Sequence, residues 1–327
     1  MRVLVCGGAG YIGSNMTAVL AAKGHEPIVF DNLSKGHKSA IGDTEFVKGD
    51  LADSRLLVET LEKYSIEAVM HFAAFIEVGE SVQTPLRYYR NNLCCTENLL
   101  SAMETVGVEK LVFSSTAAVY GIPKNVPITE NSPTEPINPY GQTKLAVERM
   151  CHYQSRTGKL AFASLRYFNT CGAGNNATIG EDHRPESHLI PLTIQAAMGK
   201  RSDIKIYGTD YDTPDGTCIR DYIHIDDLCR AHLLALNKLQ TEREMIYNLG
   251  NGKGYSVREV IETVRKVMGK NFTVVEAERR PGDSPILTSD ATKIRKELGW
   301  KIEKPQLEEM VSTAWEWHSK HPDGYPD

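Results

Sequence analysis

The chain has 327 residues and lacks both long apolar runs and long basic runs. Its apolar runs are far shorter than the roughly 18 residues that a membrane-spanning helix needs. The apolar stretch at residues 1–6 is followed directly by glycines and is too short for a signal peptide. The net charge of −5 is mild. We therefore expect neither a membrane nor nucleic acid as a partner, and a globular chain of one large domain or two.

Cysteine is scarce and dispersed. The seven cysteines form no Cys-x-x-Cys pair and no Cys/His cluster with zinc spacing. An odd, scattered set of thiols is typical of reduced cysteines in a cytoplasmic protein. The sequence therefore predicts a cytoplasmic chain that holds no metal.

The first half alternates short apolar runs with amphipathic stretches. Strands are expected at 2–6, 27–30, 45–48, 68–72, 110–114 and 160–167. Helices are expected between them at about 11–23, 53–64, 85–106 and 140–157. This alternation predicts an α/β fold, with a doubly wound parallel sheet of the Rossmann type over residues 1–168.

From about residue 169 the alternation loosens. A stretch rich in Gly, Asn and Pro at 171–185 precedes helices expected near 188–198, 225–237, 256–269, 290–298 and 305–318. We expect residues 169–327 to form a smaller α/β region over the carboxyl edge of the sheet, where ligands bind in such folds. The boundary between the two regions, near residue 168, is approximate, because segments later in the chain can return to the main sheet.

A glycine-rich turn joins the first expected strand to the first expected helix. It reads Gly7-Gly8-Ala9-Gly10-Tyr11-Ile12-Gly13 and fits the dinucleotide fingerprint. Its glycines let the backbone approach a pyrophosphate, which then lies at the helix N-terminus. Asp31 ends the second strand, where a carboxylate bonds the ribose hydroxyls and repels a 2′-phosphate. The pattern predicts NAD rather than NADP; the alternative is a structural turn without a nucleotide.

Further polar and small residues follow the third and fourth strands. Asp50 precedes Leu51, and Phe72 precedes Ala73 and Ala74. Because strand ends share one edge of the sheet, Asp50 is placed to bond an adenine amino group and the alanines leave room for the cofactor. A purely structural role for each residue is the alternative.

Tyr140 and Lys144 stand four residues apart at the start of an expected helix, so their side chains share a face. An ammonium favours a phenolate beside it, which brings Tyr140 towards the range of a general base. Tyr120 and Lys124 have the same spacing, but Pro123 between them breaks a helix. Spacing alone therefore does not identify the catalyst.

Hydroxyl residues end the fifth strand, on the same edge as Tyr140. Thr116 is the first choice to hold a substrate alcohol and share its proton, and Ser115 the second. The alternative is that these hydroxyls cap a turn. A phenol, a lysine, a hydroxyl and NAD together are the parts for hydride transfer at an alcohol carbon.

At this point the sequence resembles the extended short-chain dehydrogenase/reductase family from end to end, and within it the UDP-glucose (UDP-galactose) 4-epimerases. The motifs that carry the resemblance are Gly7 to Gly13, Asp31-Asn32-Leu33-Ser34, Gly79-Glu80-Ser81, Tyr140 to Lys144, Leu165-Arg166-Tyr167-Phe168-Asn169, Ile219-Arg220-Asp221-Tyr222-Ile223-His224 and Arg279-Arg280-Pro281-Gly282-Asp283.

The resemblance implies an NAD-dependent isomerase. Tyr140 would deprotonate O4 of a UDP-hexose, Thr116 would bond O4, and Lys144 would lower the pKa of Tyr140 and bond the nicotinamide ribose. The sugar would be oxidised at C4, turn its other face to the cofactor and be reduced again. UDP-galactose and UDP-glucose would thereby interconvert.

The same resemblance implies the two halves of the site. The cofactor side comprises Gly7, Gly10, Tyr11, Ile12, Gly13, Asp31, Asn32, Leu33, Ser34, Gly36, Asp50, Leu51, Phe72, Ala73, Ala74, Asn91, Ser114, Tyr140, Lys144 and Phe168. The substrate side comprises Thr116, Tyr140, Asn169, His188, Leu189, Lys205, Tyr207, Arg220, Arg280, Asp283 and Leu287. Guanidinium groups suit a diphosphate, which favours Arg220 and Arg280, whereas Arg279 is expected on the surface.

Two positions depart from parts of the family. Ile76 stands where some relatives carry a lysine near the pyrophosphate, which affects NAD retention rather than the chemistry. Leu287 stands where large aromatic residues restrict the sugar pocket, so N-acetylated UDP-sugars are a further expected substrate. The resemblance also implies a homodimer through the helices near 85–106 and 140–157.

Four other functions stay open at this stage. A UDP-glucuronate 4-epimerase and a sugar-nucleotide 4,6-dehydratase use related scaffolds, but dehydratases carry an Asp-Glu pair where this chain has Ala117 and Ala118. A net dehydrogenase would have little use for Arg220 and Arg280. A non-catalytic NAD-binding regulator would not need Thr116, Tyr140 and Lys144 together.

Overall fold

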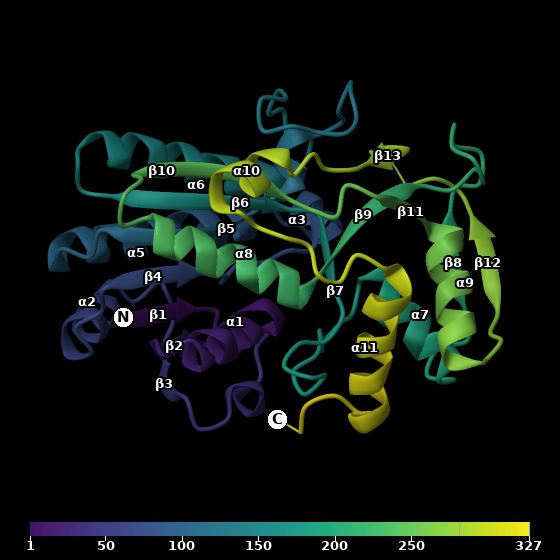
Figure 1. Ribbon diagram of the computed structural model, residues 1–327, viewed down its shortest axis with the longest axis horizontal. Helices are drawn as coiled ribbons and strands as arrows, with labels where there is room; N and C mark the ends of the chain where they lie inside the picture. The colour runs from purple at the N-terminus through teal and green to yellow at the C-terminus, as the bar shows by residue number, and fades with distance from the viewer. Residues whose placement is uncertain (281, 327) are drawn as a thin grey trace.

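The computed structural model describes residues 1–280 and 282–326 and is built around one parallel sheet (Figure 1). Its seven strands lie in the order β3-β2-β1-β4-β5-β6-β10. Their bounds are β1 Arg2–Cys6, β2 Glu26–Asp31, β3 Glu45–Lys48, β4 Ala68–His71, β5 Lys110–Thr116, β6 Ala161–Tyr167 and β10 Glu244–Leu249. The predicted doubly wound parallel sheet is therefore confirmed.

Helices cover both faces of the sheet. One face carries α1 (Tyr11–Ala22), α8 (Ile225–Lys238) and α10 (Thr292–Leu298). The other carries α2 (Ser54–Lys63), α5 (Cys95–Val106) and α6 (Pro139–Arg156). Successive strand residues point to opposite faces, so Val3 and Val5 pack with α1 and α8 while Leu4 and Cys6 pack with the other layer.

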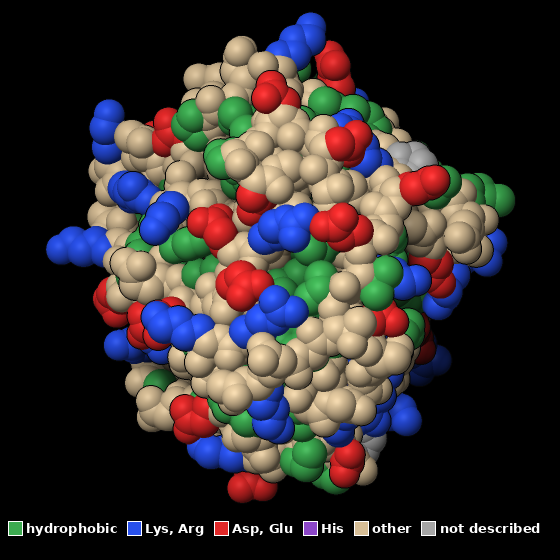
Figure 2. Space-filling view, turned by 90° about the vertical axis from the view of Figure 1, so that its right-hand side faces the viewer, with side chains coloured by type: hydrophobic (Ala, Val, Ile, Leu, Met, Phe, Trp, Pro, Cys, Tyr) green, Lys and Arg blue, Asp and Glu red, His purple; other side chains and the backbone are tan. Residues whose placement is uncertain are grey.

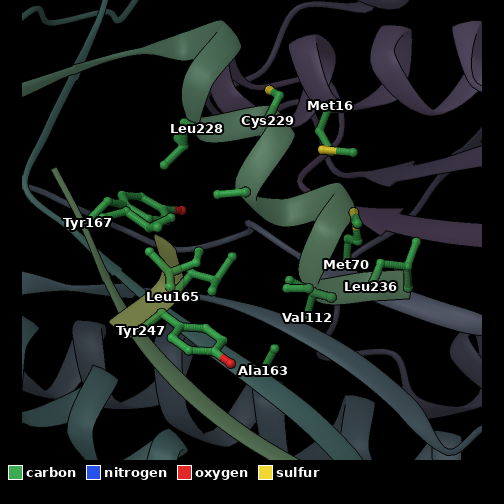
Figure 3. Packing of buried hydrophobic residues seen from close by; sticks show 14 of the residues in the cluster. Met16, Met70, Val112, Ala163, Leu165, Tyr167, Leu228, Cys229, Leu236 and Tyr247 are labelled. Carbon is green, nitrogen blue, oxygen red and sulfur yellow. The ribbon is translucent and has the colours of Figure 1, made fainter. Parts of the chain in front are cut away.

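The core beneath α8 shows why the strands are apolar throughout. Leu228 and Leu236 point from α8 toward the strands that carry Leu165 and Val112 (Figure 3). Met16 of α1 lies beside α8 in the same cluster. A sheet that is buried on both faces needs apolar side chains at consecutive positions, and this is the pattern that the sequence has.

Local signals set several helix ends. Asn138 accepts the Gly141 N–H at 2.9 Å, and Pro139 occupies the first turn of α6. Ser256 and Glu259 form a capping box at the start of α9 (Val257–Met268), which ends at Gly269 with φ of 61°. The chain around residues 78–94 is also helical, as α3 (Val78–Gln83), α4 (Pro85–Tyr88) and a π-helical turn, Tyr89–Cys94, that leads into α5.

Apart from α8, β10 and α10, the chain after β6 forms a second layer of structure beside the carboxyl edge of the main sheet (Figure 1). Its strands form two small sheets: β11-β9-β13 with β7 on β9, and β12-β8. The elements are β7 Asn169–Cys171, α7 Leu189–Ala197, β8 Ile204–Tyr207, β9 Ile219–His224, β11 Gly254–Ser256, β12 Val274–Ala277, β13 Ile286–Leu287 and α11 Leu307–Lys320. Short 3₁₀ turns occur at Lys38–Ile41 and Ala117–Tyr120.

Three later segments return to the main sheet and the helices that cover it: α8, β10 and α10. β10 pairs in parallel with β6, and α8 packs on the same core as α1. The split at residue 168 stays a prediction, since α8 and β10 come after it in the chain. Pro281, part of the Arg279–Asp283 motif, lies outside the described residues.

The end of the molecule formed by β8, β12 and α9 mixes charges of both signs (Figure 2). Lys and Arg side chains alternate there with Asp and Glu. Within residues 1–280 and 282–326, no helix is both long and apolar enough to cross a membrane.

Candidate active site

A cavity of about 1270 Å³ runs along the carboxyl edge of the main sheet. It is lined by residues that follow β1, β2, β4, β5 and β6, and by the segments around residues 181–188 and 280–287. Most of the predicted site residues line it: Gly7, Gly10, Tyr11, Ile12, Gly13, Asp31, Asn32, Ser34, Gly36, Asp50, Leu51, Phe72, Ala73, Ala74, Asn91, Ser114, Thr116, Tyr140, Phe168, Asn169, His188, Arg220, Arg280, Asp283 and Leu287. The fold thus brings both halves of the predicted site into one space.

The glycine turn is packed on one side and open on the other. A Cβ on Gly7 would lie 2.5 Å from Ala73 N, and a Cβ on Gly13 would lie 2.1 Å from Gly7 O. A Cβ on Gly10 would meet only Gly7 O, at 3.4 Å. Gly10 therefore faces open space at the start of α1, where the helix has no side-chain cap and no acidic residue in its first turn. This is the arrangement that a phosphate requires.

Asp31 organises the loop after β2. Its carboxylate accepts hydrogen bonds from Ala9 N at 3.0 Å and Leu33 N at 2.8 Å. The second bond holds Leu33 at φ of 60°, and burial raises the pKa of Asp31. Asn32 donates to Asp50 Oδ2 at 2.7 Å, which joins the ends of β2 and β3 along the cavity.

Tyr140 and Thr116 form the polar centre of the cavity wall. A hydrogen bond with the Thr116 side chain lowers the pKa of Tyr140, but burial acts more strongly and the carboxylate of Glu77 adds to it. Together they raise the pKa of Tyr140 to about 12. The protein alone therefore keeps this phenol protonated at neutral pH, and a further positive charge is needed to make it a base.

Lys144 is buried one turn behind Tyr140. Its Nζ donates to the Ser114 carbonyl oxygen at 2.7 Å and lies 4.8 Å from the centre of the Phe113 ring. Burial lowers the pKa of Lys144 to about 7, against the opposing attraction of Glu148. Lys144 does not line the cavity, so its effect on Tyr140 stays a prediction for the cofactor-bound state.

The alternative hydroxyl, Ser115, faces away from the cavity. It donates to Glu148 Oε1 at 2.5 Å, and the same carboxylate pairs with Arg166 in the interior. Arg166 also donates to Tyr120 Oη at 2.9 Å. Neither Ser115 nor Tyr120 lines the cavity. Both are buried in the core, whereas Lys124, the partner of Tyr120 in the competing Tyr-x-x-x-Lys pair, is exposed.

The two predicted phosphate-binding arginines reach the cavity from different segments. Arg220 Nη2 lies 3.3 Å from Asp283 Oδ1, and Nη1 donates to Ser284 O at 2.8 Å. The Arg280 guanidinium carbon lies 3.7 Å from the centre of the Tyr207 ring. Arg279 instead pairs with Asp210 at 2.7 Å, with both side chains largely exposed.

The comparisons with known proteins agree with this geometry. The model of the NAD dependent epimerase/dehydratase family matches residues 3–250. The chain belongs to this family. It is 50% identical over 326 residues to the UDP-glucose 4-epimerase of Halalkalibacterium halodurans, which covers 99% of this chain and 98% of the relative.

Solved structures of UDP-glucose 4-epimerases have the same fold as this epimerase/dehydratase family member. The crystal structure from Bifidobacterium longum, in complex with NAD⁺ and UDP, has a TM-score of 0.95 at 39% identity and covers 99% of this chain and 100% of its own. The UDP-Glc/GlcNAc 4-epimerase from Campylobacter jejuni has a TM-score of 0.86 at 44% identity and covers 98% of this chain and 99% of its own.

Some residues that the resemblance assigned lie off the cavity. Leu33, Lys144, Leu189, Lys205 and Tyr207 do not line it. Leu189 packs with α7 and α9 residues, and Lys205 is exposed on β8 between the buried Ile204 and Ile206. Leu33 packs against Ala9 and Ile41. The direct ligand contacts assigned to these five residues in the family resemblance remain predictions.

Other cavity residues escaped the sequence analysis. Glu77 lies close enough to raise the pKa of Tyr140, and it lines the cavity. A dehydratase was disfavoured because Ala117 and Ala118 carry no carboxylate, yet the structure places this glutamate nearby. Glu181, His183 and Glu186 also line the cavity. Their signal was the spacing Glu-x-His-x-x-Glu-x-His at 181–188, which a search for Cys/His clusters does not detect.

Proposed function

We propose that the chain is an NAD-dependent UDP-glucose 4-epimerase that interconverts UDP-galactose and UDP-glucose by oxidation and re-reduction at C4. The observation that carries the proposal is that Tyr140 and Thr116 stand together on the wall of one continuous cavity. The glycine turn lines the same cavity, and so do Arg220 and Arg280. A proton acceptor thus lies between a dinucleotide site and two cations suited to a diphosphate.

The residues present fit NAD. The open side of Gly10 at the uncapped start of α1 suits the pyrophosphate, and Asp31 lines the cavity where the adenosine ribose would lie. Bound NAD supplies the hydride acceptor and donor for C4 of the sugar. Its nicotinamide also carries a positive charge, and a positive charge near Tyr140 lowers the pKa of the phenol.

Tyr140 takes the proton from O4 of the sugar and returns it in the second half of the reaction. Thr116 holds O4 beside the proton acceptor, since Thr116 and Tyr140 line the same part of the cavity wall. Lys144 stabilises the phenolate from behind, with its Nζ held by the Ser114 carbonyl oxygen. One residue acts as base and then as acid, so the cycle needs no net oxidant.

Inversion at C4 requires the 4-keto sugar to turn while UDP stays bound. Arg220, Arg280 and Asp283 hold the nucleotide end, and Asn169 lines the cavity nearer the sheet. The Asn169 side chain already donates to Asp221 O at 2.9 Å, which fixes its orientation. Tight binding of the diphosphate together with weak binding of the hexose leaves the sugar free to rotate.

Leu287 favours a sugar pocket that also admits N-acetylated hexoses. It lines the cavity at the end of β13, whose register pairs Leu287 with Arg220. A leucine leaves more room than a tyrosine at that position, so UDP-GlcNAc and UDP-GalNAc are further substrates. The dual name of the Campylobacter jejuni relative agrees with this extension.

The chain works as a homodimer in the cytoplasm. Large apolar side chains lie exposed on α6 and on two helices that pack against it: Tyr153 of α6 is 70% exposed, Val82 of α3 61% and Leu86 of α4 78%. A second copy that covers them would remove this apolar area from water. The seven free cysteines are typical of the reducing cytoplasm.

The experiment that tests the function is incubation of the purified protein with UDP-galactose and no added NAD. UDP-glucose should accumulate to equilibrium, with no steady rise in absorbance at about 340 nm, where a net dehydrogenase would produce reduced cofactor. A mass lower by one water would identify a dehydratase, and turnover of UDP-glucuronate alone would identify the other epimerase. If none of these substrates reacts, a non-catalytic NAD-binding regulator would be the remaining alternative function.

A further inference from the structure

Four side chains of the loop between β7 and α7 converge on one point. Glu181, His183, Glu186 and His188 each present a carboxylate oxygen or an imidazole nitrogen, and these four atoms lie within 4.8 Å of one another. His188 Nδ1 lies 2.5 Å from Glu181 Oε1, and His183 Nδ1 lies 3.1 Å from the same oxygen. We infer that these four residues form a binding site for a divalent transition-metal ion of the Zn²⁺ class.

The chemistry of the four ligands selects this class of ion. Two imidazoles and two carboxylates supply nitrogen and oxygen donors, a set that Zn²⁺ accepts in four-coordinate sites. Ca²⁺ and Mg²⁺ prefer oxygen alone. Ligand atoms around one tetrahedral Zn²⁺ lie on the order of 3–3.5 Å apart. The 3.1 Å between His183 Nδ1 and Glu181 Oε1 falls in that interval. His188 Nδ1 and Glu181 Oε1 are hydrogen-bonded at 2.5 Å and would have to separate to bind the ion.

His183 provides an observation independent of the clustering. Its Nδ1 is shielded from solvent and has no hydrogen-bond partner among the described residues, although Glu181 Oε1 is near. His183 Nδ1 and Glu181 Oε1 are thus close without hydrogen-bond geometry, as two ligands of one ion are, whereas His188 Nδ1 is hydrogen-bonded to Glu181 Oε1 directly. An imidazole nitrogen buried without such a partner costs free energy.

The carboxylates of the cluster are buried, which also requires a compensating charge. The side chains of Glu181 and Glu186 are each 5% exposed, and that of His183 is 16% exposed. Two anionic groups held together away from water repel each other unless cations lie between them, and without a metal the imidazoles of His183 and His188 supply that charge through ion pairs with Glu181 and Glu186. A divalent cation would neutralise both and free the histidines to bind it as neutral ligands.

The loop is held in shape by contacts outside the cluster. Glu186 Oε1 accepts from Ser187 N at 2.7 Å and from His188 N at 2.8 Å. Tyr325 N donates to Asp182 Oδ2 at 2.9 Å, and Lys35 Nζ donates to Arg184 O at 3.0 Å. The C-terminal end and the loop after β2 therefore hold the ligands in place from two sides, which lowers the cost of assembling the site.

The inference does not depend on the proposed reaction, because the ion can be measured without substrate. We would strip the full-length protein with a chelator, titrate it with Zn²⁺ by calorimetry, and count bound zinc by elemental analysis after gel filtration. One Zn²⁺ per chain with a Kd below about 1 µM is expected. X-ray absorption should give two nitrogen ligands at about 2.0–2.1 Å. Binding that never saturates would overturn the inference.

Amino-acid substitutions test whether the bound zinc lies in the loop between β7 and α7. Glu181→Gln and His183→Gln should each weaken zinc binding by at least about 100-fold. His152→Gln is the matched control, because His152 also pairs with a glutamate, Glu244, but lies on α6 outside the cluster. Cys94→Ser tests the exposed thiol as a rival ligand. Retention of zinc in His183→Gln, or its loss in Cys94→Ser, would overturn the inference.

The folding of each variant is checked by its melting temperature in chelator. If His183→Gln fails to fold, His188→Gln replaces it, since that side chain is 43% exposed and tolerates substitution better. Saturating Zn²⁺ should raise the melting temperature of the parent protein by about 2 °C or more and leave that of the folded variants unchanged. An equal rise in both would contradict the site.

Discussion

Lys144 Nζ donates to the main-chain carbonyl oxygen of Ser114 at 2.7 Å, which fixes the ammonium behind Tyr140 at the end of β5. Burial lowers the pKa of Lys144 to about 7 and raises that of Tyr140 to about 12. The charge of Lys144 and the acidity of Tyr140 are therefore set by the same buried environment, and a change in one should appear in the titration of the other.

Replacing Lys144 by Met should move the pH dependence of turnover to higher pH. Without the ammonium the pKa of Tyr140 rises, so the phenolate becomes available only in more alkaline solution. At pH 7 we expect kcat to fall by about 10²-fold or more, with partial recovery toward pH 10. The measurement is kcat against pH for both proteins.

Lys124→Met is the control for that experiment. Lys124 has the same spacing from Tyr120 but is exposed on the segment after the 3₁₀ turn. Its pH profile should match that of the parent chain. A Lys144→Met profile that falls in height without shifting would contradict the proposed action of Lys144 on the phenol.

Replacing Tyr140 by Phe should remove the proton acceptor and preserve the cavity. We expect kcat to fall by about 10³-fold or more, while NAD stays bound because the glycine turn and Asp31 are untouched. The assay is conversion of UDP-galactose, with bound nucleotide measured after denaturation. Tyr153→Phe, on the same helix but 70% exposed, should remain fully active. Substantial activity in Tyr140→Phe would rule out this residue as the base.

Replacing Leu287 by Tyr should narrow the sugar pocket. The larger ring would occupy space beside the hexose, so kcat/KM for UDP-GlcNAc should fall by about 10-fold or more relative to that for UDP-glucose, a difference of about 1.4 kcal/mol. Both substrates are assayed with the same preparation. An unchanged ratio would show that Leu287 does not set the choice of substrate.

Replacing Leu86 by Arg should separate the proposed dimer. Leu86 is 78% exposed on α4, and a charge there would be buried without a partner if two copies met on this surface. Light scattering after gel filtration should give the dimer mass for the parent chain and a monomer for the variant. Val275→Arg, at an exposed position on β12, is the control and should stay dimeric. A parent chain that runs as a monomer would refute the dimer itself.

Replacing His232 by Phe should reduce the loss of stability in acid. His232 donates to Leu228 O, packs between the Phe72 and Tyr167 rings, and has its pKa lowered to about 4 by burial. Between pH 4 and 6.5 the unfolded chain binds a proton there that the folded chain does not, so the free energy of unfolding falls as the pH drops below about 6.5.

From pH 7.5 to 5.5, the parent chain should lose about 1 kcal/mol more than His232→Phe. Urea unfolding at the two pH values measures this difference. His152→Gln, at an exposed histidine, should lose as much stability as the parent chain. Equal losses in the parent chain and His232→Phe would mean that His232 is not neutral in the folded protein.

Much of the fold followed from local patterns. The expected helix at 140–157 corresponds to α6 at Pro139–Arg156, because Asn138 and Pro139 mark its start. The strand expected at 2–6 is β1, because a run of buried apolar residues followed by glycines is specific to a parallel strand that enters a phosphate-binding turn. The place of β10 was not predictable, since its pairing with β6 joins residues about 80 positions apart in sequence.

The sequence by itself determined the parallel sheet, the glycine turn, Asp31 at the end of β2, and the presence of a phenol and a lysine one helical turn apart. These features depend on neighbours in the chain, and periodicity or fixed spacing reports them. Only the tertiary structure decided that Thr116 faces the cavity while Ser115 bonds Glu148 in the interior. Adjacent residues of a strand point to opposite faces, and packing decides which face holds the ligand.

The tertiary structure likewise decided between the two Tyr-x-x-x-Lys pairs and brought Glu77 near Tyr140. It also gathered Glu181, His183, Glu186 and His188 around one point. The charge state of each of these groups depends on how much water the fold removes and which charges it leaves nearby. The spacing of residues along the chain does not report the burial of a group or the charges near it. Both depend on segments that come together only when the chain is folded.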